Sequence, residues 1–244
     1  MKAVKASIIV VAAGSGVRLG ANVPKAFVEL GGESLLAINL RTIGQVAAAM
    51  EAVVAAPLGW EDMARRIARV SGATLPIKVI AGGEERQDSV RIALELTSVE
   101  SEIVAIHDAA RPLASVSLFD KCIERAAAAG AAIAAAPLAD TLKRGVEGLI
   151  TETVPRAGLW QAQTPQAFRR GLIVRAHAAA QEQGWAATDD AELVERLGAQ
   201  VALVESSSHN FKITTPDDLK LAELVLRARG PHSGSPSGSL SNQR

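Results

Sequence analysis

Short, almost wholly apolar runs alternate with longer amphipathic segments along most of the chain. Runs of this kind are typical of parallel strands that are covered on both faces. They predict buried strands at Ser7–Ala12, Ala52–Ala56, Ile77–Ala81, Ile103–His107, Ala131–Ala136 and Val201–Glu205. Apolar residues at helical spacing predict helices at Leu35–Ala48, Trp60–Val70, Asp88–Leu96, Ser117–Ala128, Arg169–Gln181, Asp189–Leu197 and Asp217–Ala228. This alternation favours an α/β fold, a three-layer sandwich with a mainly parallel, Rossmann-like sheet.

The region from Asp140 to Trp160 departs from the alternation of strands and helices. Polar and apolar residues alternate there around Gly145 and Gly148, which is the pattern of a β-hairpin. A hairpin that leaves the sheet exposes its apolar side chains, and a second subunit is the simplest cover for them. We therefore expect an extended arm over about residues 140–160 that joins two subunits into a homodimer.

The last residues differ in composition from the rest of the chain. From Gly230 onward Ser, Gly and Pro dominate, and such a segment has nothing to bury. We expect a single domain over residues 1–230, followed by a disordered tail over residues 231–244.

Composition removes several classes of function. The 244 residues carry 26 Lys and Arg against 26 Asp and Glu, so no global field attracts nucleic acid or an acidic membrane. Aromatic residues make up only 3%, which disfavours a base-stacking surface. Cys122 is the single cysteine, and the longest charge-free apolar stretch, Ala126 to Ala139, is too short to span a bilayer. We expect a cytoplasmic protein that binds neither membrane nor nucleic acid.

A glycine-rich loop that follows the first strand carries the densest chemical signal. Gly14 and Gly16 allow backbone N–H groups to wrap an anion, but Gly20 comes one residue too late for a dinucleotide fingerprint, and a P-loop lysine is absent. Arg18 and Lys25 bring two cations to this loop, which suits a triphosphate that releases pyrophosphate. A glycine-rich turn with solvated cations is the alternative interpretation.

Two further loops begin at strand ends, where ligands bind in parallel α/β sheets. One contains Gly82 and Gly83 and leads into a helix. In the other, Asp108 could hold Mg²⁺ or a hydroxyl group, and Arg111 could bind a phosphate or pair with Asp108. His107, next to an apolar strand, is more typical of a satisfied core histidine than of a metal ligand.

Two basic residues stand further along the chain. Arg156 follows the expected arm. Lys212 lies between Phe211 and Ile213, so its side chain points away from their face, into solvent or into a cleft. Periodicity alone favours solvent for Lys212.

The motifs together resemble a known family. The opening Ala-Ala-Gly-x-Gly-x-Arg-x-Gly with a later Pro-Lys is similar to the nucleotidyltransferase superfamily, which has a fold of the nucleotide-diphospho-sugar transferase type. Further along come Gly-Gly-x-x-Arg-x-x-Ser-Val, His-Asp-Ala-Ala-Arg-Pro, Asp-Thr-Leu-Lys, Gln-Thr-Pro-Gln-x-Phe, Thr-Asp-Asp-Ala and Asn-x-Lys-Ile-Thr-x-Pro-x-Asp-Leu. This ordered set, from about Ser7 to Leu226, resembles the 2-C-methyl-D-erythritol 4-phosphate cytidylyltransferases of the non-mevalonate isoprenoid pathway.

The resemblance implies an activity and a set of residue roles. Enzymes of this family transfer CMP from CTP to the phosphate of methylerythritol phosphate, release pyrophosphate and use Mg²⁺. By motif, the catalytic residues are Arg18, Lys25, Arg156 and Lys212. CTP binding is implied for Ala12, Ala13, Gly14, Gly16, Gly83 and Ser89. Substrate binding is implied for Asp108, Arg111 and Thr141, with Asp108 as a possible ligand of a Mg²⁺ ion that the triphosphate mainly holds.

Three other functions remain open at this point. A cytidylyltransferase for another polyol phosphate, such as ribitol 5-phosphate, would share the CTP half of the site. A nucleotide-binding scaffold without activity is disfavoured because all four cations are present. A dinucleotide-dependent oxidoreductase is disfavoured by the glycine spacing.

Overall fold

The protein is described by a computed structural model that covers residues 4–14, 16, 19 and 22–229. Arg18 and the expected tail at 231–244 lie outside the described residues. Within the described part of the chain, no helix has the length and apolar character needed to cross a bilayer.

A seven-stranded sheet forms the centre of the molecule, in the order β11-β7-β10-β6-β1-β4-β5. All neighbours pair in parallel except β10, which runs antiparallel to both β6 and β7. The strands are β1 (Ala6–Val11), β4 (Ala49–Ala56), β5 (Ile77–Ala81), β6 (Ile103–Asp108), β7 (Ala131–Pro137), β10 (Trp160–Arg169) and β11 (Ala202–Glu205). The expected mainly parallel α/β sheet is confirmed.

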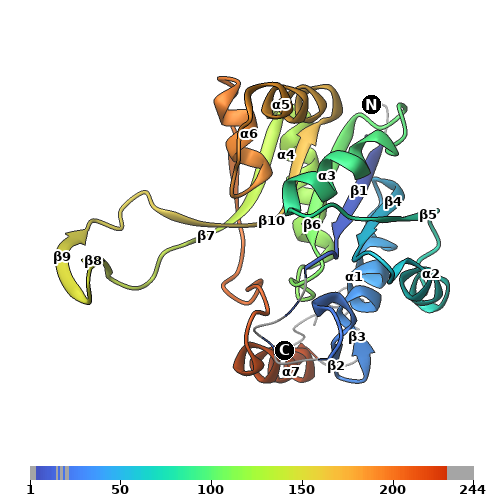
Figure 1. Ribbon diagram of the computed structural model, residues 1–244, viewed down its shortest axis with the longest axis horizontal. Helices are drawn as coiled ribbons and strands as arrows, with labels where there is room; N and C mark the ends of the chain where they lie inside the picture. Colours follow the sequence, from blue (N-terminus) through green and yellow to red (C-terminus); the bar gives the residue numbers. More distant parts are fainter. Residues whose placement is uncertain (1–3, 15, 17–18, 20–21, 230–244) are drawn as a thin grey trace, which may run out of the picture.

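Helices cover both faces of the sheet and complete three layers (Figure 1). One face packs against α1 (Leu35–Ile43), α2 (Glu61–Val70) and α4 (Val116–Ala129). The other packs against α3 (Arg86–Glu95), α5 (Arg170–Gln183) and α6 (Asp190–Arg196). Side chains of β1 alternate between the two cores, with Ile8 and Val10 on one side and Ile9 on the other, as period-two geometry requires.

A smaller apolar cluster lies beside the carboxyl edge of the sheet. It includes the last helix, α7 (Pro216–Arg229), and a short hairpin of β2 (Glu29–Leu30) and β3 (Glu33–Ser34). Leu30, Leu35 and Ile213 are almost fully buried there. This cluster anchors the chain on both sides of Lys25 and Lys212.

A two-stranded ribbon projects away from the body of the molecule (Figure 1). It pairs β8 (Leu142–Val146) with β9 (Leu149–Val154) in an antiparallel register. Glu147 and Gly148 both have positive φ, which is the conformation of a two-residue hairpin turn. The expected hairpin at residues 140–160 is therefore confirmed, and Leu149 and Ile150 on it are about 70% exposed.

The structure differs from the sequence-based expectations in a helix that is shorter than expected and in a central strand that was not expected. The helix expected at Leu35–Ala48 ends at Ile43, because Gly44 closes it, and β4 begins at Ala49. The central strand β10 was not predicted. Its sequence contains several glutamines and Pro165, which interrupt the apolar pattern, and its pairing with β7 is irregular between Ala162 and Gln166.

Candidate active site

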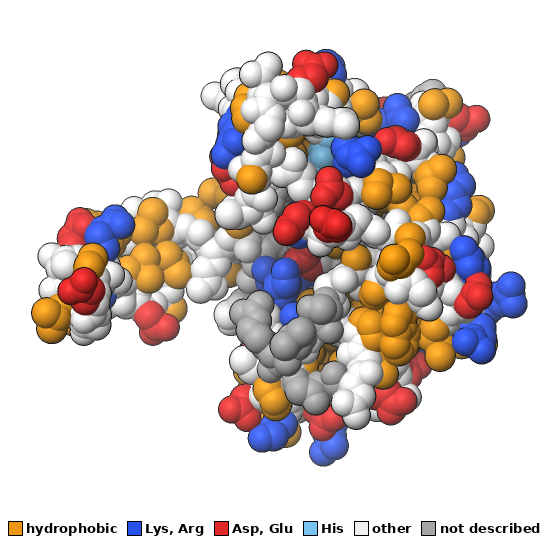
Figure 2. All heavy atoms as spheres, in the orientation of Figure 1, with side chains coloured by type: hydrophobic (Ala, Val, Ile, Leu, Met, Phe, Trp, Pro, Cys, Tyr) orange, Lys and Arg blue, Asp and Glu red, His pale blue; other side chains and the backbone are white. Residues whose placement is uncertain are grey.

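A cleft of about 420 Å³ opens at the carboxyl edge of the sheet. The loops after β1 and β6, the loop before α3 and the segment before α7 meet there. Figure 2 shows Asp or Glu side chains and Lys or Arg side chains gathered around a hollow in the middle of this face. The cleft is lined by Val11, Ala12, Ala13, Gly14, Gly16, Lys25, Ala26, Gly83, Glu84, Glu85, Arg86, Ser89, Asp108, Ala109, Ala110 and Lys212.

The loop after β1 is held against the start of a short 3-10 helix, η2 (Lys25–Phe27). The backbone N–H of Lys25 donates to the carbonyl of Gly14 at 3.3 Å. Gly16 has φ +72°, and a Cβ there would stand 2.9 Å from the backbone nitrogen of Lys25, so no other residue fits. Ala26 and Phe27 are buried and anchor η2 to the core. Lys25 is thereby fixed beside the glycine loop.

The loop before α3 depends on Ser89 for its shape. The backbone N–H of Gly83 donates to Oγ of Ser89 at 3.1 Å, and the same hydroxyl donates to the carbonyl of Glu85 at 3.1 Å. Ser89 is fully buried. Its hydroxyl therefore holds in place the loop at Gly83, which lines the cleft.

An ionised carboxylate lies at the cleft, where β6 ends. Oδ1 of Asp108 accepts a hydrogen bond from Nε of Arg86 at 3.1 Å, and Oδ2 accepts one from Nζ of Lys212 at 2.8 Å. Burial by itself raises the pKa of Asp108, but the positive charges of Arg86 and Lys212 outweigh this and hold the pKa well below its usual range. Asp108 therefore keeps its charge and ties two cations to the cleft.

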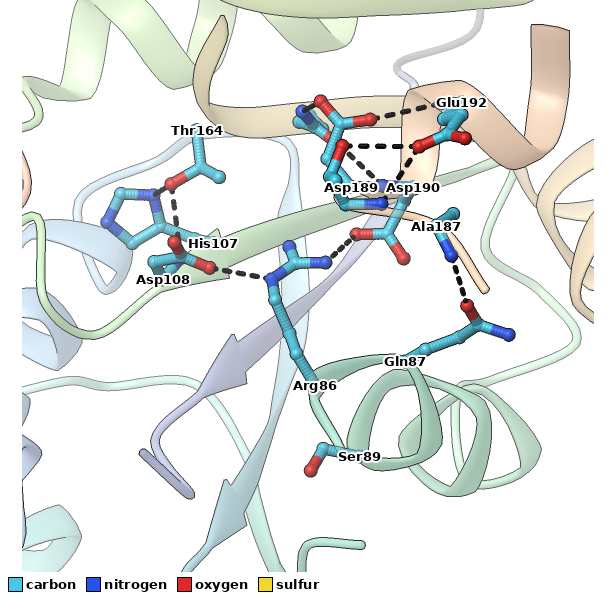
Figure 3. Close-up of polar contacts among 12 residues, drawn as sticks. Arg86, Gln87, Ser89, His107, Asp108, Thr164, Ala187, Asp189, Asp190 and Glu192 are labelled. Atoms are coloured by element: carbon cyan, nitrogen blue, oxygen red, sulfur yellow. Dashed lines mark hydrogen bonds and ion pairs between the residues drawn. The ribbon is translucent and has the colours of Figure 1, made fainter. Parts of the chain in front are cut away.

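Arg86 joins this carboxylate to a second one behind the cleft. Its Nη1 donates to Oδ2 of Asp190 at 2.7 Å, and Nε2 of His177 lies 3.0 Å from the other oxygen of Asp190. Figure 3 shows the Arg86 guanidinium between Asp108 and Asp190. Burial lowers the pKa of Arg86, yet the two carboxylates more than compensate and raise it.

His107 lies behind Asp108 and supports it as a neutral side chain. Oγ of Thr164 accepts the backbone N–H of Asp108 at 3.1 Å, so its own proton is directed to Nδ1 of His107 at 2.9 Å. Nε2–H of His107 then donates to Oδ1 of Asn39 at 2.8 Å. Burial lowers the pKa of His107 to about 4. The interpretation as a satisfied core histidine is confirmed.

Arg111 supports the backbone that carries Lys212. Its Nη1 donates to the carbonyl of Asn210 at 2.8 Å, and the backbone N–H of Ile213 donates to the carbonyl of Ala110 at 2.8 Å. Burial lowers the pKa of Arg111. The sequence left two roles open for Arg111, phosphate binding or pairing with Asp108. The structure does not pair Arg111 with Asp108, because Asp108 forms its ion pairs with Arg86 and Lys212.

The structure brings most of the predicted site residues together. Ala12, Ala13, Gly14, Gly16, Lys25, Gly83, Ser89, Asp108 and Lys212 all line the cleft. Thr141 and Arg156 are exposed at the base of the arm and are not among the lining residues. Arg18 lies outside the described residues.

Sequence reasoning did not single out Arg86 or Asp190. Arg86 does stand inside the Gly-Gly-x-x-Arg motif at a strand end, which was a usable signal. Asp190 reads simply as an acidic residue at a helix start. Their contact joins residues 104 positions apart, and no local pattern reports such a contact.

The fold and this cleft define a nucleotidyltransferase, with a glycine loop, a lysine beside it and a carboxylate-held lysine opposite. The family model for IspD, 2-C-methyl-D-erythritol 4-phosphate cytidylyltransferase, matches residues 6–228. The chain therefore belongs to the family of 2-C-methyl-D-erythritol 4-phosphate cytidylyltransferases.

Individual relatives agree with this family. The 2-C-methyl-D-erythritol 4-phosphate cytidylyltransferase of Deinococcus radiodurans is 47% identical over 221 residues, which is 91% of this chain and 89% of that protein. The crystal structure of the enzyme of the same name from Thermus thermophilus is 37% identical, with a TM-score of 0.76 over 90% of this chain and 98% of that one. The 4-diphosphocytidyl-2C-methyl-D-erythritol synthase of Anaerococcus prevotii is 30% identical, with a TM-score of 0.81 over 93% of this chain and 100% of that one.

Proposed function

We propose that the cleft binds CTP and transfers its cytidylyl group to the phosphate of 2-C-methyl-D-erythritol 4-phosphate, releasing pyrophosphate. The observation that carries this proposal is the convergence of the glycine loop, Lys25 and the Asp108–Lys212 pair on one cleft. Family membership gives the same activity, with the same two substrates.

The reaction needs positioning and charge stabilisation more than acid–base chemistry. An oxygen of the acceptor phosphate forms a bond to the α-phosphorus of CTP, and the bond from that phosphorus to the bridging oxygen breaks. The electron pair leaves with pyrophosphate. Because a phosphate is already ionised at neutral pH, the attack requires no general base, and a neutral buried His107 is consistent with this.

Different cations bind the triphosphate and the acceptor phosphate. Lys25, beside the glycine loop, faces the triphosphate and stabilises negative charge in the transition state, together with Arg18. Lys212 orients the acceptor phosphate, and Asp108 restrains its ammonium group. A lysine in a loop loses less entropy on binding a phosphate when a carboxylate already fixes its position.

The nucleotide is held mainly by backbone. Ala12, Ala13, Gly14 and Gly16 form one wall of the cleft, and the loop at Gly83 forms the other. Close approach of a ligand to backbone N–H groups is what a glycine-rich loop permits. Ser89 contributes by fixing the loop at Gly83.

A divalent metal fits this site as a companion of the triphosphate. Nucleotidyltransferases typically use one, and we propose Mg²⁺ here. The described residues contain no cluster of three His, Cys, Asp or Glu side chains that could cage an ion. Asp108 could add one carboxylate ligand, since each of its oxygens retains a lone pair. When bound, Mg²⁺ neutralises charge on the phosphates.

The arm supports a homodimer. Val146, Leu149 and Ile150 are more than half exposed on the ribbon, and apolar side chains at such exposure favour a partner surface. Thr141 and Arg156 lie at the base of the arm, outside the cleft of their own chain. We propose that the arm carries them to the cleft of a second copy, where Arg156 orients the acceptor together with Lys212.

The test is release of pyrophosphate from CTP, Mg²⁺ and methylerythritol phosphate, with ribitol 5-phosphate and the other nucleoside triphosphates assayed in parallel. Release that requires both CTP and methylerythritol phosphate is the expected result. Release with ribitol 5-phosphate alone would move the protein to the sister activity. A folded protein that binds CTP without turnover would overturn the proposed reaction.

A further inference from the structure

A continuous series of polar side chains runs from α5 to Lys212 at the cleft, and its His177, Asp190 and Asp108 members are buried. Nε2 of His177 meets Oδ1 of Asp190, and Oδ2 of Asp190 accepts Nη1–H of Arg86. Nε–H of Arg86 donates to Oδ1 of Asp108, whose Oδ2 accepts Nζ–H of Lys212. The view in Figure 3 shows the middle of this series, where Arg86 separates the two carboxylates.

Asp190 is a buried carboxylate that lies outside the cleft. It is 1% exposed and is not one of the lining residues. A buried carboxylate is costly unless it is paired and hydrogen-bonded. Burial raises the pKa of Asp190, but the charge of Arg86 outweighs it and the pKa is lowered, so Asp190 is ionised next to Arg86.

The contact with Asp190 determines how Arg86 binds Asp108. A guanidinium prefers to take both oxygens of a carboxylate in a bidentate pair. Here Asp190 binds Nη1 and only Nε is directed to Asp108, so Oδ2 of Asp108 stays available to Lys212. Without the charge of Asp190, Arg86 would turn toward both oxygens of Asp108 and compete with Lys212.

Lys212 depends on that oxygen for its position. It lies in a segment without regular secondary structure between β11 and α7, and its side chain is 40% exposed. Four rotatable bonds leave an unrestrained ammonium group spread over many positions. The hydrogen bond to Asp108 at 2.8 Å selects one of them.

We propose that Asp190 is a positioning residue: through Arg86 and Asp108 it fixes the ammonium group of Lys212 where the acceptor phosphate binds. This inference rests on the proposed function, in which Lys212 orients that phosphate. Asp190 itself touches neither substrate.

The experiment uses Asp190→Asn, which keeps the shape of the side chain and removes its charge. At saturating CTP we expect the KM for methylerythritol phosphate to rise about tenfold, because a charge-assisted contact that orients its phosphate is weakened. The dissociation constant of CTP should stay within about twofold of wild type. A purely structural role would instead lower the active fraction and kcat, and leave the KM of the folded enzyme unchanged.

Two further variants keep the result interpretable. Arg91→Gln removes the exposed Arg91–Glu95 pair on α3, the helix that Arg86 begins, and should leave both constants unchanged. Arg86→Gln combined with Asp190→Asn also removes the guanidinium that would compete with Lys212 for Oδ2 of Asp108. In this double variant the KM for methylerythritol phosphate should stay within about twofold of wild type, and a tenfold rise would overturn the inference even if Asp190→Asn alone proved too unstable to assay.

A double-mutant cycle identifies the route of the effect. In a Lys212→Ala background, Asp190→Asn should raise the KM for methylerythritol phosphate no further, because the residue it acts through is gone. An equal rise in both backgrounds, or no rise in the single variant, would overturn the inference. If the wild-type protein released no pyrophosphate, the proposed function itself would be refuted. That outcome is distinguishable from a failure of the inference about Asp190, in which the wild-type protein is active.

Discussion

Gly82→Ala should force apart the two loops that form the nucleotide side of the cleft. A Cβ at Gly82 would stand 2.7 Å from Cβ of Ala13, on the β1 loop, and 2.7 Å from Oγ of Ser89. Non-bonded carbon atoms pack best at about 3.5–4.0 Å, so the loops must separate by roughly 1 Å. Overpacking of this kind costs about 1–3 kcal/mol of folding stability. A displacement of about 1 Å at a reacting site costs roughly 10²-fold in rate.

The assay combines thermal unfolding with steady-state pyrophosphate release. For a chain of this size the expected loss of stability lowers Tm by roughly 2–12 °C, while kcat/KM for CTP falls about 10²-fold. Gly171→Ala is the matched control, since a Cβ there meets only Nη1 of Arg175 at 3.8 Å and the position is helical. It should raise stability by up to about 1 kcal/mol and leave turnover unchanged. Wild-type kcat/KM in Gly82→Ala would refute the steric argument.

Three other predictions concern the catalytic lysine, the arm and the buried histidine. Lys25→Ala should lower kcat by about 10²-fold or more with Tm unchanged, as when one charge-stabilising donor is lost; near-normal turnover would exclude the assigned role. Replacing residues 142–154 by a short glycine linker should give inactive monomers in sedimentation experiments, and an active monomer would contradict sharing of the arm. His107 binds a proton in the unfolded chain below about pH 6.5 but in the folded one only below about pH 4. Stability should therefore fall by about 3 kcal/mol as pH drops through this window, measured as Tm against pH. His107→Gln should show a flatter profile, and an equally steep one would assign the effect to another group.

Strand and helix positions could be predicted because the apolar pattern reports burial directly. The runs around Ile8, Val53 and Ile106 have both faces covered, and the structure places them in the middle of the sheet. The arm could be predicted because polar and apolar residues alternate around its glycines. This pattern differs from the continuous apolar runs of the strands that are covered on both faces. β10 escaped because its glutamines are buried with polar partners: Oε1 of Gln163 accepts from Asn210, and Oε1 of Gln166 accepts the backbone N–H of Asp190.

Some features of the candidate site could likewise be predicted from the sequence, whereas others required the folded structure. The glycines that follow strand ends were identifiable because their loops must lie at the carboxyl edge of a parallel sheet. The role of Ser89 as support for the loop at Gly83 required the folded geometry, since the hydroxyl could equally have faced a ligand. The choice of solvent for Lys212 from periodicity alone was wrong, because Asp108 draws the side chain to the cleft.

The sequence by itself determined the class of fold, the positions of the glycine loops and the family, because these depend on local patterns and on motifs in a fixed order. Only the tertiary structure decided which charges meet. The order of the strands places the end of β6 beside the segment before α7, and it brings α6 behind α3, so that Arg86 joins Asp108 to Asp190. Periodicity reports which face of an element is buried, whereas the identity of a partner depends on which elements become neighbours.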